Sequence, residues 1–172
     1  MQLLALRDYS RQEMEQRLLR WLQAQHAKNA LGAGAEPDSD DSGSGLDEDA
    51  LLQQYRSAIA EVLDSMQDKG YLSDQRAAQA VAQRRASQFG VLRIQQELKT
   101  KGIAPELAQD LLDSLRGSEV VRAHAVWKKR FGQLPATLAE RSKQTRYLAS
   151  RGFGADAVRA VLRGMAVDGD DL

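Results

Sequence analysis

The chain has 172 residues, is rich in residue types that form helices well (Ala, Leu, Gln, Arg and Glu), and contains no cysteine. The lack of cysteine excludes disulfides, thiolate metal sites and cysteine nucleophiles, and it fits the reducing cytoplasm in which we expect the chain. No apolar run approaches the roughly 20 residues of a membrane span. Asp8 interrupts the start of the chain too early for a signal peptide.

The formal net charge is zero, but the charges are unevenly distributed. Residues 32–50 carry seven acids and no base, and residues 167–172 add three acids. Without these ten acids, 24 bases face 14 acids, so the rest of the chain carries +10 (24 − 14). Such a basic body with acidic appendages favours nucleic acid or an acidic protein groove as a partner.

The first predicted helix covers residues 11–28, with a short lead-in helix at 2–8. Ser10-Arg11-Gln12-Glu13 has the Ser-x-x-Glu form of a capping box, and apolar residues then recur at intervals of four. Residues 32–50 are expected to be disordered, because the Gly, Ser, Asp and Pro that dominate them cannot bury apolar surface. A second amphipathic helix is predicted over 47–68.

Part of the acidic segment resembles a calcium-binding loop. Asp38-Ser39-Asp40-Asp41-Ser42-Gly43 matches the start of an EF-hand loop, and Asp49 stands where the bidentate Glu would be. However, Gly45 replaces the usual apolar eighth residue, the twelfth side chain is short, and no partner hand follows. We interpret the segment as a low-complexity insert and expect no metal site and no cofactor.

An internal repeat then predicts the architecture. Three segments share the pattern apolar-x-x-Lys/Arg-Gly-apolar: 66–71, 98–103 and 148–153. In each, a cation in the last helical turn complements the helix dipole, Gly70, Gly102 or Gly152 follows at positive φ, and the next apolar residue folds back on the turn. Further helices are predicted over 74–88, 91–101, 105–115, 118–131, 137–150 and 155–165.

These elements predict an all-α fold of three tandem three-helix repeats forming an elongated, curved array. The first repeat covers residues 1–71 and is interrupted by the disordered acidic insert at about 32–50. The second covers 72–116 and the third 117–166. A disordered acidic tail follows at 167–172.

No catalytic constellation is present in the sequence. His26 and His124 are far apart, and neither Gly-x-Ser-x-Gly nor Gly-x-x-x-x-Gly-Lys-Ser/Thr occurs. We interpret both histidines as surface or helix-packing residues. Trp21 and Trp127 are interpreted as core residues, with stacking on nucleic-acid bases as the alternative. The sequence therefore predicts a non-enzymatic protein, with no catalytic residue, that binds another macromolecule.

The basic residues do not follow the mixed signs of an ordinary solvated face. Glu97 is the only acid among six bases in 76–101, and residues 116–163 hold eleven bases and three acids. We predict that this surface binds a polyanionic or acidic partner. The candidate partner-binding residues are Arg84, Arg85, Arg93, Lys99, Lys101, Lys128, Lys129, Arg130, Arg141, Lys143 and Arg146.

These residues also carry a resemblance to RecX, the bacterial regulatory protein of the RecA recombinase. The matching pieces lie in order over about 3–165: Ser10-x-x-Glu13-Met14, 70–76, Arg84-Arg85, 90–103, Lys129-Arg130-Phe131-Gly132 and 146–153. The chain departs from the family's pattern at Ala77-Ala78, where an aromatic residue is common, at Gln88-Phe89-Gly90, and in the acidic insert.

The resemblance implies three repeats of three helices in a curved array. It also implies binding to the RecA filament on single-stranded DNA, with inhibition of filament extension, ATPase, strand exchange and the co-protease activity behind the SOS response. ATP and magnesium would belong to RecA. We expect a monomer with weak direct DNA binding and no membrane association. The alternative is a direct nucleic-acid-binding repeat protein that acts through its basic face.

Overall fold

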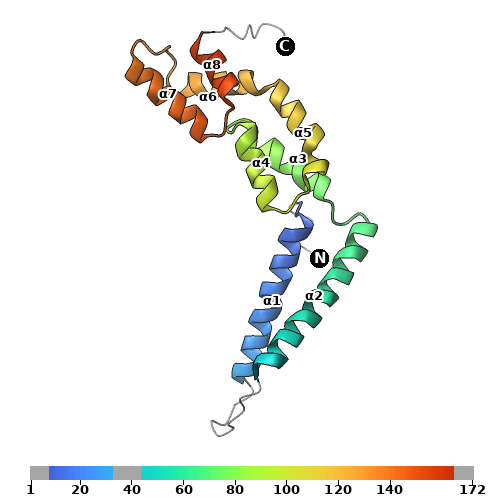
Figure 1. Ribbon diagram of the computed structural model, residues 1–172. Coiled ribbons are helices and arrows are strands. Elements are labelled where there is room, and N and C mark those ends of the chain that lie inside the picture. Colours follow the sequence, from blue (N-terminus) through green and yellow to red (C-terminus); the bar gives the residue numbers. More distant parts are fainter. Residues whose placement is uncertain (1–7, 33–43, 165–172) are drawn as a thin grey trace. The chain divides into compact units, whose positions relative to one another are not determined.

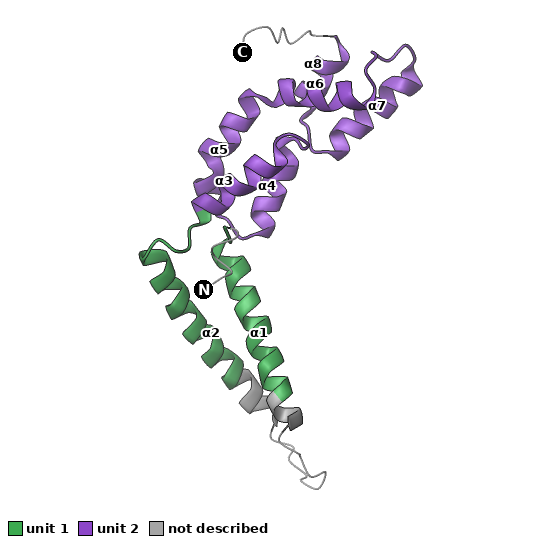
Figure 2. Cartoon of the chain, turned by 180° about the vertical axis from the view of Figure 1, so that it is seen from behind, with its two compact units in different colours: residues 1–74 green, residues 75–172 purple. Residues whose placement is uncertain are grey.

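The computed structural model describes residues 8–32 and 44–164 (Figure 1). These residues form helices connected by short turns, with no strand, which confirms the all-α class. The helices are α1 (Arg11–Gly32), α2 (Ser44–Asp68), α3 (Asp74–Arg85), α4 (Val91–Thr100), α5 (Pro105–Gly117), α6 (Glu119–Arg130), α7 (Leu138–Ser150) and α8 (Ala155–Leu162). The chain divides into two compact units, Met1–Asp74 and Gln75–Leu172 (Figure 2).

Several helix ends differ from the prediction. Helix α2 begins at Ser44, three residues before the predicted start at residue 47, so it includes the end of the acidic insert. The predicted helix over 74–88 ends at Arg85 and the one over 155–165 at Leu162. The lead-in helix up to residue 7, the candidate calcium segment Asp38–Gly43 and the tail 167–172 lie outside the described residues.

In the first unit, α1 and α2 pack side by side on a small apolar cluster. Its buried members are Met14, Ile59, Leu63 and Leu72. The predicted capping box is confirmed, because the Glu13 amide donates to Ser10 Oγ at 3.2 Å and the Ser10 amide donates to Glu13 Oε2 at 3.2 Å. Together these contacts fix the start of α1 and pair it with α2.

The interpretation of Trp21 as a core residue is wrong, because this side chain is 57% exposed. The described part of this unit contains α1 and α2, and α1 packs mainly on α2. A helix that packs on a single neighbour buries one stripe, and in α1 that stripe follows Met14 and the half-buried Leu18 and Leu22. Trp21 precedes Leu22 by one residue and therefore lies about 100° around the helix from it.

The second unit contains two apolar clusters, each built by three helices. Helices α3, α4 and α5 bury residues that include Ala77, Ala78 and Ile94. The second cluster belongs to α6, α7 and α8 and includes Trp127, which is 5% exposed, and Leu148. The core prediction for Trp127 is thus confirmed. Small residues at 77 and 78 are buried to 1% exposure, where an aromatic side chain would need more room.

The three predicted glycine caps are confirmed. Gly70, Gly102 and Gly152 have φ values of 71°, 68° and 81°. Each cap has two crossed backbone hydrogen bonds; at Gly102, its amide donates to Lys99 O at 3.0 Å and the Ile103 amide donates to Leu98 O at 3.1 Å. This is the pattern of a Schellman motif, in which the residue after the C-cap has positive φ. It explains why each repeat has glycine at this position.

The expected apolar contact after the cap holds in two of the three repeats. Ile103 and Phe153 are buried to 4% and 2% exposure. Tyr71, at the same position, is 60% exposed, so the prediction is wrong there. The next residue, Leu72, is buried instead, and its amide donates to Met66 O at 3.1 Å. The turn therefore uses a different side chain to cover the end of α2.

Gly102→Val is expected to destabilise the second unit by about 1–2 kcal/mol, because a β-branched side chain is strained at positive φ. Chemical denaturation followed by circular dichroism measures this loss. Gly102→Asn is the control, since Asn tolerates the left-handed region better and is expected to lose less. Equal midpoints for the parent and the Val variant would contradict the assignment of Gly102 as a strained cap.

Candidate functional site

All eleven candidate partner-binding residues lie in the second unit. Ten of them have exposed side chains, and Lys101, at the end of α4, is half-buried. They come from the C-terminal turn of α3, from α4, from the C-terminal turn of α6 and from α7. The second unit therefore presents cations on four of its helices, whose packing is fixed by the two apolar clusters.

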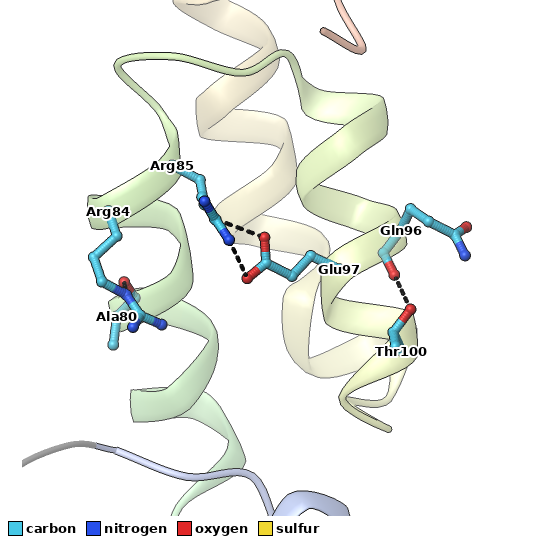
Figure 3. Close-up of polar contacts among 6 residues, drawn as sticks. All are labelled: Ala80, Arg84, Arg85, Gln96, Glu97 and Thr100. Carbon is cyan, nitrogen blue, oxygen red and sulfur yellow. Dashed lines mark hydrogen bonds and ion pairs between the residues drawn. The ribbon is translucent and has the colours of Figure 1, made fainter. Parts of the chain in front are cut away.

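Arg85 and Arg84 both make hydrogen bonds within the fold. Arg85 on α3 donates through Nε to Glu97 Oε2 on α4 at 2.8 Å, forming an ion pair that joins the two helices (Figure 3). The Arg84 guanidinium turns back along its own helix and donates to Ala80 O at 3.1 Å (Figure 3). Arg85 is 46% exposed and so remains accessible to a partner, although part of its charge is compensated by Glu97.

A single aromatic ring gathers three arginines. The guanidinium carbons of Arg85, Arg93 and Arg151 lie 5.5, 5.3 and 5.5 Å from the centroid of Phe89. Arg151 also lies 5.1 Å from the centroid of Tyr147. Cations at this distance are attracted by the negative faces of aromatic rings. Phe89 thus holds three positive charges close together, against one carboxylate from Glu97.

An open concavity of about 550 Å³ lies beside this cluster. Ser87 and Gln88 line it from the loop before α4, and Lys129 and Arg130 line it from α6. Tyr147 and Arg151 complete it from the end of α7. The concavity carries three cations and no carboxylate among its lining residues, so it offers a positive, partly aromatic depression to an anionic group.

The remaining candidates are spread more widely. Lys99 follows Arg93 by six residues on α4, or about 9 Å along the helix. Lys143, on α7, lines a separate concavity of about 230 Å³ with Glu140 and Phe131. Arg146 donates to Ser142 O within its own helix. The structure therefore groups Arg85 with Arg93, and Lys129 with Arg130, but gives no single cluster of all eleven.

Sequence reasoning missed three residues of this surface, Phe89, Tyr147 and Arg151, and it also missed the structural role of Arg122. Arg151 carries a signal in the sequence, because the repeat pattern places a cation before each cap glycine, but that pattern assigns the cation only to the helix dipole. The half-buried Arg122 donates to the carbonyl oxygens of Ala86 at 2.9 Å, Phe89 at 2.8 Å and Leu115 at 2.7 Å.

The electrostatics of Arg122 differ from those of the exposed cations. Burial lowers the pKa of its guanidinium from the ordinary value, and the Glu119 carboxylate partly opposes this by raising it. The side chain stays charged at neutral pH, because an arginine pKa lies far above 7. Its charge is directed at backbone carbonyls inside the fold and is therefore not presented to a partner.

The histidines occupy the positions expected of packing and surface residues. His124 is half-buried with its ring centroid 5.5 Å from that of Trp127, and His26 is exposed on α1.

Over the described ranges 8–32 and 44–164, no three His, Cys, Asp or Glu side chains gather as a metal site. Within the same ranges, no helix is long and apolar enough to cross a bilayer.

Comparison with known proteins identifies the family. Residues 73–112 match the family model described as the second three-helix domain of RecX, and residues 118–162 match that of the third. A regulatory protein RecX from Leptothrix cholodnii is 50% identical over 105 residues, covering 61% of this chain and 67% of that protein. One from Chromobacterium violaceum is 30% identical over 167 residues, covering 97% and 88%. The chain belongs to the RecX family.

A further relative, the regulatory protein RecX of Ralstonia nicotianae, is 39% identical over 126 residues, covering 70% of this chain and 79% of that protein. These RecX relatives are named as regulatory proteins. The two matched RecX domains correspond to α3–α5 and α6–α8, a tandem helical repeat. All eleven candidate residues, as well as Phe89, Arg122 and Arg151, fall inside the matched ranges.

Proposed function

We propose that this chain is a negative modulator of the RecA recombinase. It binds the RecA filament on single-stranded DNA in the cytoplasm and inhibits filament extension, ATPase, strand exchange and co-protease activity, thereby restraining homologous recombination and the SOS response. Membership of the RecX family carries the proposal. The basic surface of the second unit supports it, because a filament of protein carboxylates and DNA phosphates is an anionic partner.

The alternative function is direct binding of nucleic acid as the primary activity. The concavity that contains Lys129, Arg130 and Tyr147 favours it, since phosphates bind basic grooves. Binding of single strands also relies on free aromatic faces on which bases stack. Phe89 and Tyr147 instead contact guanidinium groups, which occupy ring faces that a base would need. These contacts support phosphate binding with little base stacking, so we rank filament inhibition first and expect naked-DNA binding to be weak.

Titration of the single-stranded-DNA-dependent ATPase of RecA tests the leading proposal. The protein is expected to inhibit at concentrations where binding to naked single-stranded DNA, measured in the same buffer, is negligible. A direct binder would hold naked DNA with an affinity that falls steeply with salt, by a logarithmic slope of about −0.7 per contacted phosphate. ATPase inhibition that only follows occupancy of naked DNA would favour the alternative.

Charge reversal at Lys128, Lys129 and Arg130 is expected to raise the half-inhibitory concentration about tenfold. These three side chains are all exposed, so their reversal is expected to leave the fold intact. Exposed ion pairs contribute about 0.2–1 kcal/mol each, so three together are needed for a clear effect. Reversal of Arg84, Arg85 and Arg93 is expected to act in the same direction. It also places a new carboxylate against Glu97, so its folding must be checked first.

A matched control reverses three exposed cations of the first unit, Arg20, Lys28 and Arg56. It changes the net charge by the same amount, so it separates a local surface from a general charge effect. Both proteins are compared at one moderate salt concentration, because salt screens exposed charges. Equal inhibition by the parent and by both folded reversal variants of the second unit would contradict its role as the binding surface.

A further inference from the structure

Two half-buried charged residues of α6, Arg122 and Glu119, connect the third RecX domain to the second. Arg122 donates to Ala86 O at 2.9 Å and to Phe89 O at 2.8 Å, two carbonyls that follow the end of α3. A guanidinium has five N–H donors in a fixed plane, so one side chain can satisfy several acceptors that a helix end leaves open. A cation at the end of α3 also complements the negative end of its dipole.

Glu119 contacts the other end of the same loop, at the start of α4. Its Oε1 accepts a hydrogen bond from the Val91 amide at 2.8 Å, at the first residue of α4. A carboxylate at this place complements the positive end of the α4 dipole. Glu119 and Arg122 lie one turn apart on α6. This one helix of the third domain therefore forms hydrogen bonds with both ends of the loop that connects α3 to α4 in the second domain.

The backbone closes the same junction from the other side. The Gly90 amide donates to Arg151 O at 3.0 Å, and the Leu92 amide donates to Gly152 O at 3.1 Å. A Cβ atom on Gly90 would lie 2.2 Å from Gly152 O, so the two backbone segments are in direct contact without intervening side chains. Arg151 adds a contact to the ring of Phe89. The junction thus has charged, backbone and aromatic contacts around a few loop residues.

We propose that Arg122 and Glu119 are positioning residues that hold the basic surfaces of the second and third domains in one fixed arrangement, so that both engage a single continuous anionic partner at once. The inference rests on the proposed function for the identity of that partner. The second domain contains Arg84, Arg85 and Arg93, and the third domain contains Lys129 and Arg130. A rigid connection lets the second surface bind at high effective concentration once the first is bound.

This arrangement fits a partner that presents anionic groups over an extended, regular surface. A short flexible acidic peptide could satisfy one cluster alone and would gain little from the junction. The filament named in the proposed function is of the extended kind. Loosening the junction should therefore weaken inhibition, although no partner-facing charge is removed.

The geometry can be measured without any partner, because the chain contains no cysteine. Cysteines introduced by Gln83→Cys on α3 and Thr145→Cys on α7, both at exposed positions, allow specific spin labelling of the two domains. Pulsed electron–electron double resonance then gives the distribution of distances between the two spin labels. The parent is expected to give one narrow distribution. Arg122→Gln, which cannot make the three charged contacts, is expected to give a broad one.

Inhibition of the RecA ATPase is measured on the same variants without labels. Arg122→Gln is expected to raise the half-inhibitory concentration about tenfold, and Arg122→Lys to recover part of both properties, because its single ammonium retains the charge but not the fork. Urea denaturation followed by circular dichroism establishes that the variants remain folded. If Arg122→Gln does not fold, Glu119→Gln takes its place, because it removes the carboxylate charge and keeps an acceptor for the Val91 amide.

An unchanged distance distribution in a folded variant would overturn the positioning role. A broadened distribution with unchanged inhibition would overturn the need for a fixed arrangement. The two measurements also separate this inference from the proposed function. Failure of the parent to inhibit RecA would remove the proposed partner, whereas the effect of Arg122 on the distance distribution would still report on the junction itself.

Discussion

Gly90→Val is expected to destabilise the second unit by about 4 kcal/mol or more, the size reached when a substitution forces atoms into a packed interior. The new Cβ would lie 2.2 Å from Gly152 O and 2.3 Å from Phe153 N. Both are backbone atoms, so no flexible side chain can move aside. The φ of Gly90 is −77°, which any residue adopts, and the expected loss is therefore purely steric.

Urea denaturation followed by circular dichroism measures the effect. Gly117→Ala is the matched control, because its added Cβ meets nothing within 4 Å and it lies in α5. Alanine there is expected to be neutral or to stabilise by about 0.5–1 kcal/mol, since glycine is unfavourable in a helix. A Gly90→Val protein with the midpoint of the parent would show that the two domains do not approach as closely as the structure places them.

Local sequence signals predicted the features that depend on neighbouring residues. The Ser10–Glu13 capping box and the glycine caps at Gly70, Gly102 and Gly152 need only a few consecutive residues, and all are present. The capping box at Thr137 and Glu140 was not predicted, although it has the same kind of pattern. Features of this kind can be predicted from sequence because their hydrogen bonds close within one turn.

Features that depend on distant partners were predicted less well. Trp21 and Tyr71 have the apolar character of core residues, but both are exposed, because burial depends on how many helices cover a face. Conversely, Arg122 belongs to a basic stretch, yet its acceptors include Ala86 and Phe89, more than 30 positions earlier in the chain. Charge counts alone could not distinguish such a residue from an exposed cation.

The candidate binding surface shows the same limit. The excess of bases predicted a basic face, and the exposure of Lys128, Lys129 and Arg130 agrees with that expectation. The ion pair of Arg85 with Glu97 follows only from the packing of α3 against α4. Whether these residues contact the partner stays a prediction. How the first repeat stacks on the second also stays a prediction.

The repeat itself supplies the last prediction. Met66, Leu98 and Leu148 occupy the same position, five residues before the apolar residue that follows the cap. Leu98 and Leu148 are 2% and 0% exposed, whereas Met66 is only half-buried. Leu98→Ala and Leu148→Ala are each expected to cost about 2–5 kcal/mol, because they lose buried methyl groups and leave a cavity in a three-helix cluster. Met66→Ala is expected to cost less.

Urea denaturation of the three variants at one temperature gives the ranking. Leu107→Ala on α5 is the control, because it removes the same atoms from a side chain that is 51% exposed, and it is expected to change stability by about 0.5 kcal/mol or less. Equal losses at all three repeat positions would mean that the first unit buries Met66 as deeply as the second unit buries its leucines. A larger loss at Met66 than at Leu148 would contradict the burial order on which the prediction rests.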